Sequence, residues 1–226
     1  MLLTAAHARA GSVHGRLEIV SSHDPDVRKH SDYSGLVVWL EPAAGAASVP
    51  PARKKATMEQ KGKHFIPHIL AIEVGTVVDF PNYDPIFHNA FSNFDGQIFD
   101  VGLYPPGTSR SVSFKRDGIV RIFCNIHPTM SAVIVVLKSP YFSVSAKTGD
   151  FTIPNVPSGS YRLHVFHERA TQQTLDAITR AVEVSSDADV GRITVSESGY
   201  LLVPHKNKYG KDYPPAEGGA YPGGKP

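Results

Sequence analysis

The chain has 226 residues and a mass of 24.5 kDa, a length that fits one large domain or two small ones. Hydrophobic residues make up 41% and charged residues 19%, so the chain has the material for a buried core and is not a disordered polar tract. Its 23 Lys and Arg against 21 Asp and Glu leave a net charge of +2, too small for a protein that holds nucleic acid by neutralising phosphates. No apolar run approaches the roughly 20 residues that span a bilayer, so we expect no transmembrane segment.

Residues 1–11 are rich in Leu and Ala and end near an Ala-x-Ala-like sequence, so we interpret them as a signal remnant or a flexible N-terminus. Two strands are predicted next, Val13–Val20 and Gly35–Leu40, because both are rich in aliphatic and β-branched residues. The polar stretch Ser21–Ser34 between them is predicted to be a loop. The Ala, Gly and Pro of Glu41–Pro51 are typical of a linker.

Regularly spaced strand-like runs, separated by turn residues, fill the chain as far as residue 195. They are Ala56–Met58, His68–Val74, Thr76–Phe80, Ser111–Phe114, Ile119–Phe123, Ala132–Leu137, Tyr141–Ser145, Asp150–Ile153, Ser160–Phe166, Ala181–Val184 and Arg192–Val195. This spacing predicts an all-β protein built from sandwiches or barrels. Thr171–Arg180 is the one stretch with helical spacing, and we see no convincing cap for it. Residues 204–226 are rich in Gly, Pro, Tyr and Lys, so we expect a tail that is disordered or lies along the surface.

Three side chains that ligate soft metal ions lie within seven positions: Cys124, His127 and Met130, between two strand-like runs. A tight loop between two strands can turn all three toward one point. Thiolate and thioether favour copper, and two imidazoles, one thiolate and a weak axial Met are the ligands of a blue copper centre. The second imidazole must come from elsewhere in the chain, and His88 fits because the apolar residues that flank it could exclude water. Taken singly, such a Cys or Met is more often a core side chain, but their co-occurrence favours a metal site.

The loop and its surroundings resemble the cupredoxin family. Cys124–Met130 is similar to the Cys-x₂-His-x₂-Met ligand loop of the amicyanin group, and residues 65–82 resemble the family pattern of Phe-x-Pro, an apolar strand and Gly-x-x-Val-x-Phe-x-Asn. His88 stands where the family has its first histidine ligand, and residues 112–119 fit the strand before the loop. The resemblance implies a cupredoxin-like Greek-key β-sandwich over residues 51–137.

For the site, the resemblance implies one type 1 copper ion as cofactor. His88, Cys124 and His127 are its expected strong ligands, and Met130 is its expected weak axial ligand. In the family, the asparagine at the position of Asn89 donates its backbone N–H to the cysteine sulfur, and its side chain ties the two ligand loops together. Such a hydrogen bond withdraws charge from the sulfur and helps to set the reduction potential.

The resemblance also implies a surface for partners. Pro128 follows the ligand His127 and has no N–H to donate near the site. In the family the exposed edge of this histidine lies in an apolar patch, which Pro85, Phe87 and Pro128 are expected to form here. We therefore expect an electron carrier rather than an enzyme, in the periplasm or another extracytoplasmic space, with a cytochrome c or a periplasmic dehydrogenase as partner. Two alternatives stay open: a copper-binding or delivery protein without a redox partner, and a metal-free β-sandwich binding module.

The flanking segments resemble carboxypeptidase-regulatory-like (transthyretin-like) domains, in residues 11–17, 34–40, 145–151 and 157–163. This resemblance implies a second, small Ig/transthyretin-like β-sandwich of residues 12–50 plus 138–203, into which the cupredoxin domain is inserted. The alternative is two consecutive domains, with residues 12–50 as extra cupredoxin strands. His64 and His68, four residues apart at the start of a strand, are expected to have an ordinary surface role, with a second metal ion as the alternative.

Overall fold

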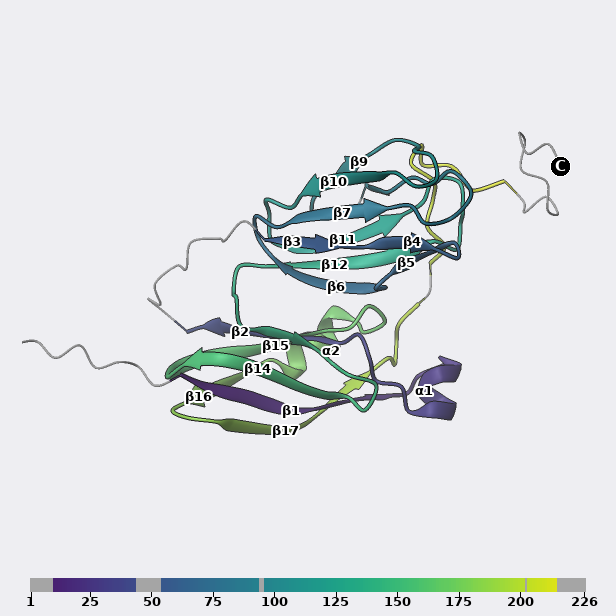
Figure 1. Ribbon diagram of the computed structural model, residues 1–226. Helices are drawn as coiled ribbons and strands as arrows, with labels where there is room; N and C mark the ends of the chain where they lie inside the picture. Colours follow the sequence, from purple (N-terminus) through teal and green to yellow (C-terminus); the bar gives the residue numbers. More distant parts are fainter. Residues whose placement is uncertain (1–9, 44–53, 94–95, 202, 215–226) are drawn as a thin grey trace, which may run out of the picture.

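The computed structural model describes residues 10–43, 54–93, 96–201 and 203–214, and it consists of two stacked β-sandwich units (Figure 1). Strands dominate and two short helices are present among these residues, so the predicted all-β class is confirmed. Neither helix is long and apolar enough to cross a membrane. Of residues 1–11, expected to be a signal remnant or a flexible N-terminus, residues 1–9 lie outside the described residues, and Ala10 and Gly11 are instead the first residues of β1 (Ala10–Val20). Most of the expected linker also lies outside the described residues.

One unit is formed by the first and the later strands of the chain, and we call it the second sandwich. One of its sheets has the order β14-β1-β17, with bounds Asp150–Pro157, Ala10–Val20 and Ala188–Ser196. The facing sheet has the order β13-β2-β15-β16, with bounds Phe142–Val144, Val37–Pro42, Gly159–Phe166 and Arg180–Val184. Leu17, Ile153 and Leu163 are fully buried between the sheets, as expected where alternate side chains of a strand face one core.

Two helices correct the sequence analysis of this unit. The expected loop Ser21–Ser34 contains α1 (Pro25–His30), which has Pro at its first position and Asp24 as its N-cap. The Asp24 side chain accepts a hydrogen bond from the backbone N–H of Asp26 at 2.8 Å. The stretch judged to lack a cap forms α2 (Gln172–Ile178), whose N-cap hydroxyl, on Thr171, accepts from the N–H of Thr174 at 3.2 Å.

The other unit, which we call the metal unit, consists of the strands between residues 55 and 137. Its first sheet has the order β10-β7-β3, with bounds Ser109–Ser113, Val77–Pro81 and Lys55–Thr57. Its second sheet has the order β6-β12-β11-β8-β9, with bounds Ile69–Glu73, Ser131–Leu137, Gly118–Phe123, Phe91–Ser92 and Phe99–Asp100. A small hairpin joins β4 (Glu59–Lys61) to β5 (His64–Ile66). The buried rings of Phe80 and Phe114 anchor the core, and both pack against Phe99.

The chain leaves the second sandwich after β2 and returns to it at β13. In β2, Trp39 lies opposite Phe142 of β13 on one side and opposite His164 of β15 on the other. Pro42, expected to lie in the linker, is instead the last residue of β2 and pairs with Tyr161. The strands from β3 to β12 therefore lie, in sequence, between two neighbouring strands of one sheet.

Strand β12 contributes to both cores at once. Alternate side chains of a strand point to opposite faces, so its seven residues divide into two sets. Ala132, Ile134 and Val136 are buried in the metal-unit core, and Val133, Val135 and Leu137 are buried in the core of the second sandwich. The two units therefore share apolar packing through one strand.

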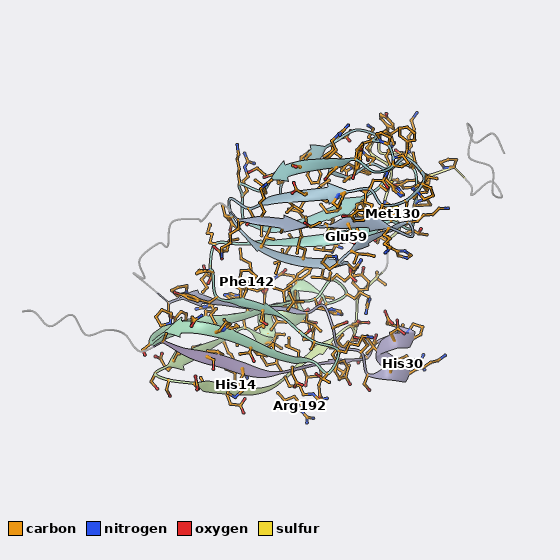
Figure 2. The ribbon with its side chains drawn as sticks, in the orientation of Figure 1. His14, His30, Glu59, Met130, Phe142 and Arg192 are labelled. Carbon is orange, nitrogen blue, oxygen red and sulfur yellow. The ribbon has the colours of Figure 1, made fainter. Side chains whose placement is uncertain are left out.

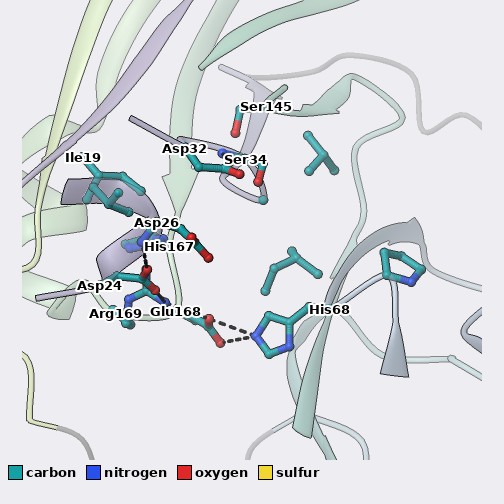
Figure 3. A pocket seen from close by; sticks show the side chains of 15 residues that line it. Ile19, Asp24, Asp26, Asp32, Ser34, His68, Ser145, His167, Glu168 and Arg169 are labelled. Atoms are coloured by element: carbon teal, nitrogen blue, oxygen red, sulfur yellow. Dashed lines mark hydrogen bonds and ion pairs between the residues drawn. The ribbon is translucent and has the colours of Figure 1, made fainter. Parts of the chain in front are cut away.

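A cavity of about 400 Å³ lies where the two units meet, and polar side chains line much of it (Figure 3). His68 directly precedes the metal unit's β6, and its Nε2 is 2.9 Å from each carboxylate oxygen of Glu168 in the second sandwich. Its other ring nitrogen faces the carbonyl of Ser131 at 3.0 Å. His68, for which an ordinary surface role was expected, thus connects the two units through hydrogen bonds to Glu168.

The interaction between His68 and Glu168 predicts that the stability of the protein depends on pH. The hydrogen bond to Glu168 raises the pKa of His68 above its ordinary value. A histidine with a raised pKa in the folded state stabilises fully below its unfolded pKa, roughly 6.5, and loses that contribution as the pH rises through its folded pKa. We therefore expect His68→Gln to lower the free energy of unfolding more at a pH of roughly 5.5 than at a pH of roughly 8.5. Urea unfolding measures this difference, and a difference that does not change with pH contradicts the prediction.

Candidate metal centre

The first histidine of the site, His88, lies in the segment between β7 and β8. Its backbone forms two hydrogen bonds with Tyr104, from His88 N–H to the Tyr104 carbonyl at 3.2 Å and in the reverse direction at 2.9 Å. The imidazole is fully buried, and its Nε2 lies 2.8 Å from Oδ2 of Asp84. Because Nε2–H donates to this carboxylate, the lone pair of the neutral ring is at Nδ1, which faces the cluster described below.

The remaining donors lie in the loop that joins β11 to β12 in an antiparallel hairpin. The backbone closes this loop through two bonds, from Cys124 N–H to the Met130 carbonyl and from Met130 N–H to the His127 carbonyl, each at 3.1 Å. The side chains of Cys124 and Met130 are fully buried in the same core, and His127 is half-buried. In Figure 2, Met130 lies toward the right-hand end of the metal unit.

Three donor atoms converge at this end of the metal unit. Nδ1 of His88 and Nδ1 of His127 are 3.1 Å apart, and the sulfur of Cys124 is 3.9 Å from the first and 3.6 Å from the second. All three atoms lie within 4.8 Å of one another, and within the described part of the chain this is the cluster of His, Cys, Asp and Glu that can hold a metal ion. Two imidazoles and one sulfur around a common point fit a copper ion, since these are the donors that Cu prefers.

Burial determines the protonation states of the three donor side chains. Burial lowers the pKa of His127 to about 4, and the neighbouring His88 contributes to this shift. Burial also lowers the pKa of His88, although Asp84 opposes the shift. Both imidazoles are therefore neutral at pH 7, which is the state that binds metal ions. Burial raises the pKa of Cys124, so metal binding must release a proton from this thiol.

Asn89 connects the two segments that carry the donors. Its side-chain oxygen accepts a hydrogen bond from the backbone N–H of Asn125, and its amide donates to Oδ1 of Asp100 at 2.7 Å and to the carbonyl of Gly102 at 2.9 Å. Its backbone N–H donates toward the sulfur of Cys124, where it opposes the rise of the thiol pKa. A fully buried amide with these partners holds the ligand loop against the segment that follows His88.

Asp84 is a site residue that the sequence analysis missed. Besides His88, it accepts backbone hydrogen bonds from Gly62 at 2.6 Å and from Lys63 at 2.8 Å, in the turn between β4 and β5. Burial acts to raise the pKa of Asp84, but these hydrogen bonds outweigh it and the pKa is lowered. The sequence signal is an acid four residues before a histidine, and this spacing alone does not indicate that the two side chains meet outside a helix.

The residues expected to form a partner surface flank the cluster. Pro85 and Pro128 are exposed, and Phe87 is 42% exposed. Phe87 directly precedes His88 in the chain, and Pro128 directly follows the half-buried His127. His64 lies apart from the cluster, with its Nδ1 2.7 Å from the carbonyl of Gly62. Neither His64 nor His68 belongs to a metal-binding group among the described residues.

No family model matches the chain. Among curated proteins, it is 37% identical over 60 residues to the methylamine utilization protein MauL of Methylorubrum extorquens. This alignment covers 26% of the chain and 53% of MauL, so the chain spans about half the length of the curated relative that it matches.

Three solved structures are similar to parts of the chain. A purple cupredoxin from Nitrosopumilus maritimus has a TM-score of 0.34 and 23% identity, covering 36% of this chain and 99% of that one. A copper-containing nitrite reductase from Thermus scotoductus has a TM-score of 0.35 and 25% identity, covering 54% of this chain and 28% of that one. A reduced amicyanin variant has a TM-score of 0.35 and 17% identity, covering 44% and 98%. The strand order and the hairpin that carries the Cys-containing loop make the metal unit a β-sandwich within an all-β chain.

Proposed function

We propose that this protein binds one type 1 copper ion and carries single electrons between redox proteins outside the cytoplasm. The observation that carries the proposal is the convergence of two neutral imidazole nitrogens and one cysteine sulfur within 4.8 Å. Copper bound there supplies a one-electron couple. The chain supplies a fixed set of donors on a β-sandwich, which limits the change in geometry between the two oxidation states.

In this proposal His88, Cys124 and His127 are the strong ligands, and Met130 is the weak axial ligand. The burial of Met130 and its position in the same closed loop support this role. In this proposal Asn89 tunes the sulfur through its N–H, which opposes the rise that burial causes in the pKa of the Cys124 thiol.

An electron carrier accounts for the burial of the site better than an enzyme does. His88, Cys124 and Met130 are fully buried, so among the proposed ligands only the half-buried ring of His127 reaches the surface. An electron can leave through the edge of this ring, whereas a substrate would have to contact the ion itself. The exposed Phe87, which precedes His88 in the chain, and Pro128, which follows His127, supply apolar area for a transient contact with a partner such as a cytochrome c or a dehydrogenase. The likeness to MauL makes an enzyme of methylamine utilization a specific candidate partner.

The remaining strands belong, in this proposal, to a transthyretin-like domain of residues 12–50 plus 138–203 that is interrupted by the copper domain, residues 51–137. Support comes from the pairing of β2 with both β13 and β15, which joins strands from the two ends of the chain in one sheet. A periplasmic location agrees with the chemistry, because a thiolate that holds Cu(II) suits an oxidising compartment.

The function is tested by adding Cu(II) to the purified metal-free protein and recording its visible spectrum. We expect one copper per chain and an intense thiolate-to-copper charge-transfer colour, which a reductant removes and an oxidant restores. A protein that stays colourless and binds only Cu(I) is a copper carrier without redox exchange. A protein that binds neither ion contradicts the proposal.

The carboxylate behind His88 gives a further prediction. In Asp84→Asn, the amide nitrogen must face at least one of the three groups that now donate to Asp84, so the support of the His88 ring is weakened. We expect copper affinity to fall roughly 10- to 100-fold, the usual cost of losing such a partner of a ligand. Competition with a chelator measures it. Asp79→Asn is the matched control, because this acid bonds to Ser111 at an exposed position of β7 and β10 and is expected to leave the affinity unchanged.

A further inference from the structure

The C-terminal stretch, residues 205–213, runs across the end of the metal unit that holds the donor cluster, and we call it the strap. The chain passes from β17 of the second sandwich along the metal unit to reach this place (Figure 1). The tail predicted at residues 204–226 was expected to be disordered or to lie along the surface, and its residues 204–214 lie along the surface. Residues 215–226 are outside the described part.

The strap has a defined fold of its own rather than an extended path. Asn207 closes a turn with Lys211 through their backbones at 2.9 Å, and Gly210 takes a φ of 72°, which favours glycine. The side-chain oxygen of Asn207 accepts from the N–H groups of Tyr209 at 2.9 Å and Lys211 at 3.1 Å. Its half-buried side chains are His205, Asn207, Lys208 and Tyr213, and the others are exposed.

Two side chains of the strap bind the ligand loop directly. The hydroxyl of Tyr213 donates to the carbonyl of Cys124 at 2.8 Å, and Nε2 of His205 donates to the carbonyl of Pro128, also at 2.8 Å. The ring of His205 stacks on Phe123 with centroids 4.1 Å apart, and the edge of Tyr213 packs against His205 at 5.2 Å. The two bonds that close the seven-residue loop use the carbonyls of His127 and Met130. The strap therefore binds two other carbonyls of the loop, those of Cys124 and Pro128.

A third contact extends the strap to the segment of the other ligand. The backbone N–H of Lys208 donates to the side chain of Asn125 at 3.0 Å, and its ammonium group lies 2.8 Å from Oδ2 of Asp100. Asp100 in turn accepts from the amide of Asn89, the residue after His88. Through these bonds the strap holds together both segments that carry donor atoms.

We propose that the strap is a positioning part of the metal centre: it fixes the loop Cys124–Met130 in its metal-binding conformation and shields it from water. The inference rests on the proposed copper function for its redox consequence, but its effect on the loop concerns the metal-free protein as well. Tyr213 and His205 are positioning residues, because they act on the ligands through the backbone of the loop. Water that reaches the loop favours the more highly charged Cu(II) state, so loss of the strap lowers the reduction potential.

The test compares Tyr213→Phe with Tyr209→Phe. Both remove one hydroxyl from a strap tyrosine, but Tyr209 is 70% exposed and its ring contacts Lys208 rather than the loop. In the metal-free protein, hydrogen exchange at the amides of residues 124–130 is expected to be roughly two- to tenfold faster in Tyr213→Phe, the effect of one neutral hydrogen bond, and unchanged in Tyr209→Phe. In the copper-loaded protein, we expect copper release to a chelator to be faster and the reduction potential to be lower in Tyr213→Phe alone.

A pair of truncations makes the same comparison with a larger effect. A chain ending at Pro204 lacks the strap, and a chain ending at Pro214 keeps it. We expect the first to show faster loop exchange, faster copper release and a lower potential, and the second to match the full chain. Equal loop exchange in Tyr213→Phe and Tyr209→Phe, or in the two truncations, overturns the role of the strap. Should the full chain bind no copper while the loop exchange still differs, the proposed function fails and the positioning of the loop by the strap stands.

Discussion

Cys124→Ser is expected to abolish the charge-transfer colour of the copper-loaded protein and to leave the fold intact. Serine has nearly the same size and fits the fully buried position, but a hydroxyl at pH 7 is not a soft anionic donor. Loss of a strong ligand should cost more than the roughly 10- to 100-fold in affinity that loss of a hydrogen-bonded partner of a ligand costs. The visible spectrum after Cu(II) addition and a chelator competition give the two readouts.

The matched control for this substitution is His64→Ala. His64 is an exposed histidine in β5 that lies outside the donor cluster. Its replacement should change neither the charge-transfer colour nor the copper affinity. Since the chain has one cysteine, no other thiolate can replace Cys124. Persistence of the colour in Cys124→Ser, or its loss in His64→Ala, would falsify the assignment of the site.

Val135→Asp is expected to destabilise both sandwich units together, by about 3–5 kcal/mol, the usual cost of an unpaired buried charge. Val135 is 1% exposed and lies on the face of β12 that packs into the core of the second sandwich, while its neighbours on the strand pack into the metal unit. Val135→Ala is the control for lost volume. It should cost about 1.6 kcal/mol, from two buried methyl groups at about 0.8 each.

Two probes separate the units in this experiment. Trp39, the one tryptophan of the chain, lies in β2 and reports on the second sandwich through its fluorescence. Hydrogen exchange in β7 and β10 reports on the metal unit. We expect both probes to shift by the same amount in urea. A transition that moves for the metal unit alone, with the Trp39 curve unchanged, means that the two cores unfold separately.

The centre of the site could be predicted from the sequence because its spacing is local. Cys124 and His127 lie on one short loop between two strands, so the approach of their donor atoms needs little beyond the hairpin itself. His88 is 36 residues from Cys124, and a family pattern rather than spacing indicated it. The class of the fold was visible for a similar reason, since runs such as Ile119–Phe123 and Ala132–Leu137 are long enough to show their β-branched composition.

What the sequence did not indicate depends on contacts between distant segments. Asp84 has its role only because the turn after β4 brings two N–H groups to its carboxylate. Tyr213 meets the carbonyl of Cys124 across 89 positions, in a segment without hydrophobic periodicity. The four strands β4, β5, β8 and β9 have two or three residues each, too few for alternation to be read. The cap of α1 was readable from Asp24 and Pro25, but the surrounding polar composition favoured a loop.

The last strand before the metal unit and the first strand after it, β2 and β13, pair in one sheet of the second sandwich. Strand β12, which directly precedes β13, also packs into the core of that sandwich, so the metal unit cannot turn against it without exposing buried side chains. A protein that binds to the second sandwich therefore has the ring of His127 at a fixed distance and in a fixed orientation. For the electron transfer that we propose, the rate then depends on where on the protein the partner binds, because electron tunnelling falls off steeply with distance.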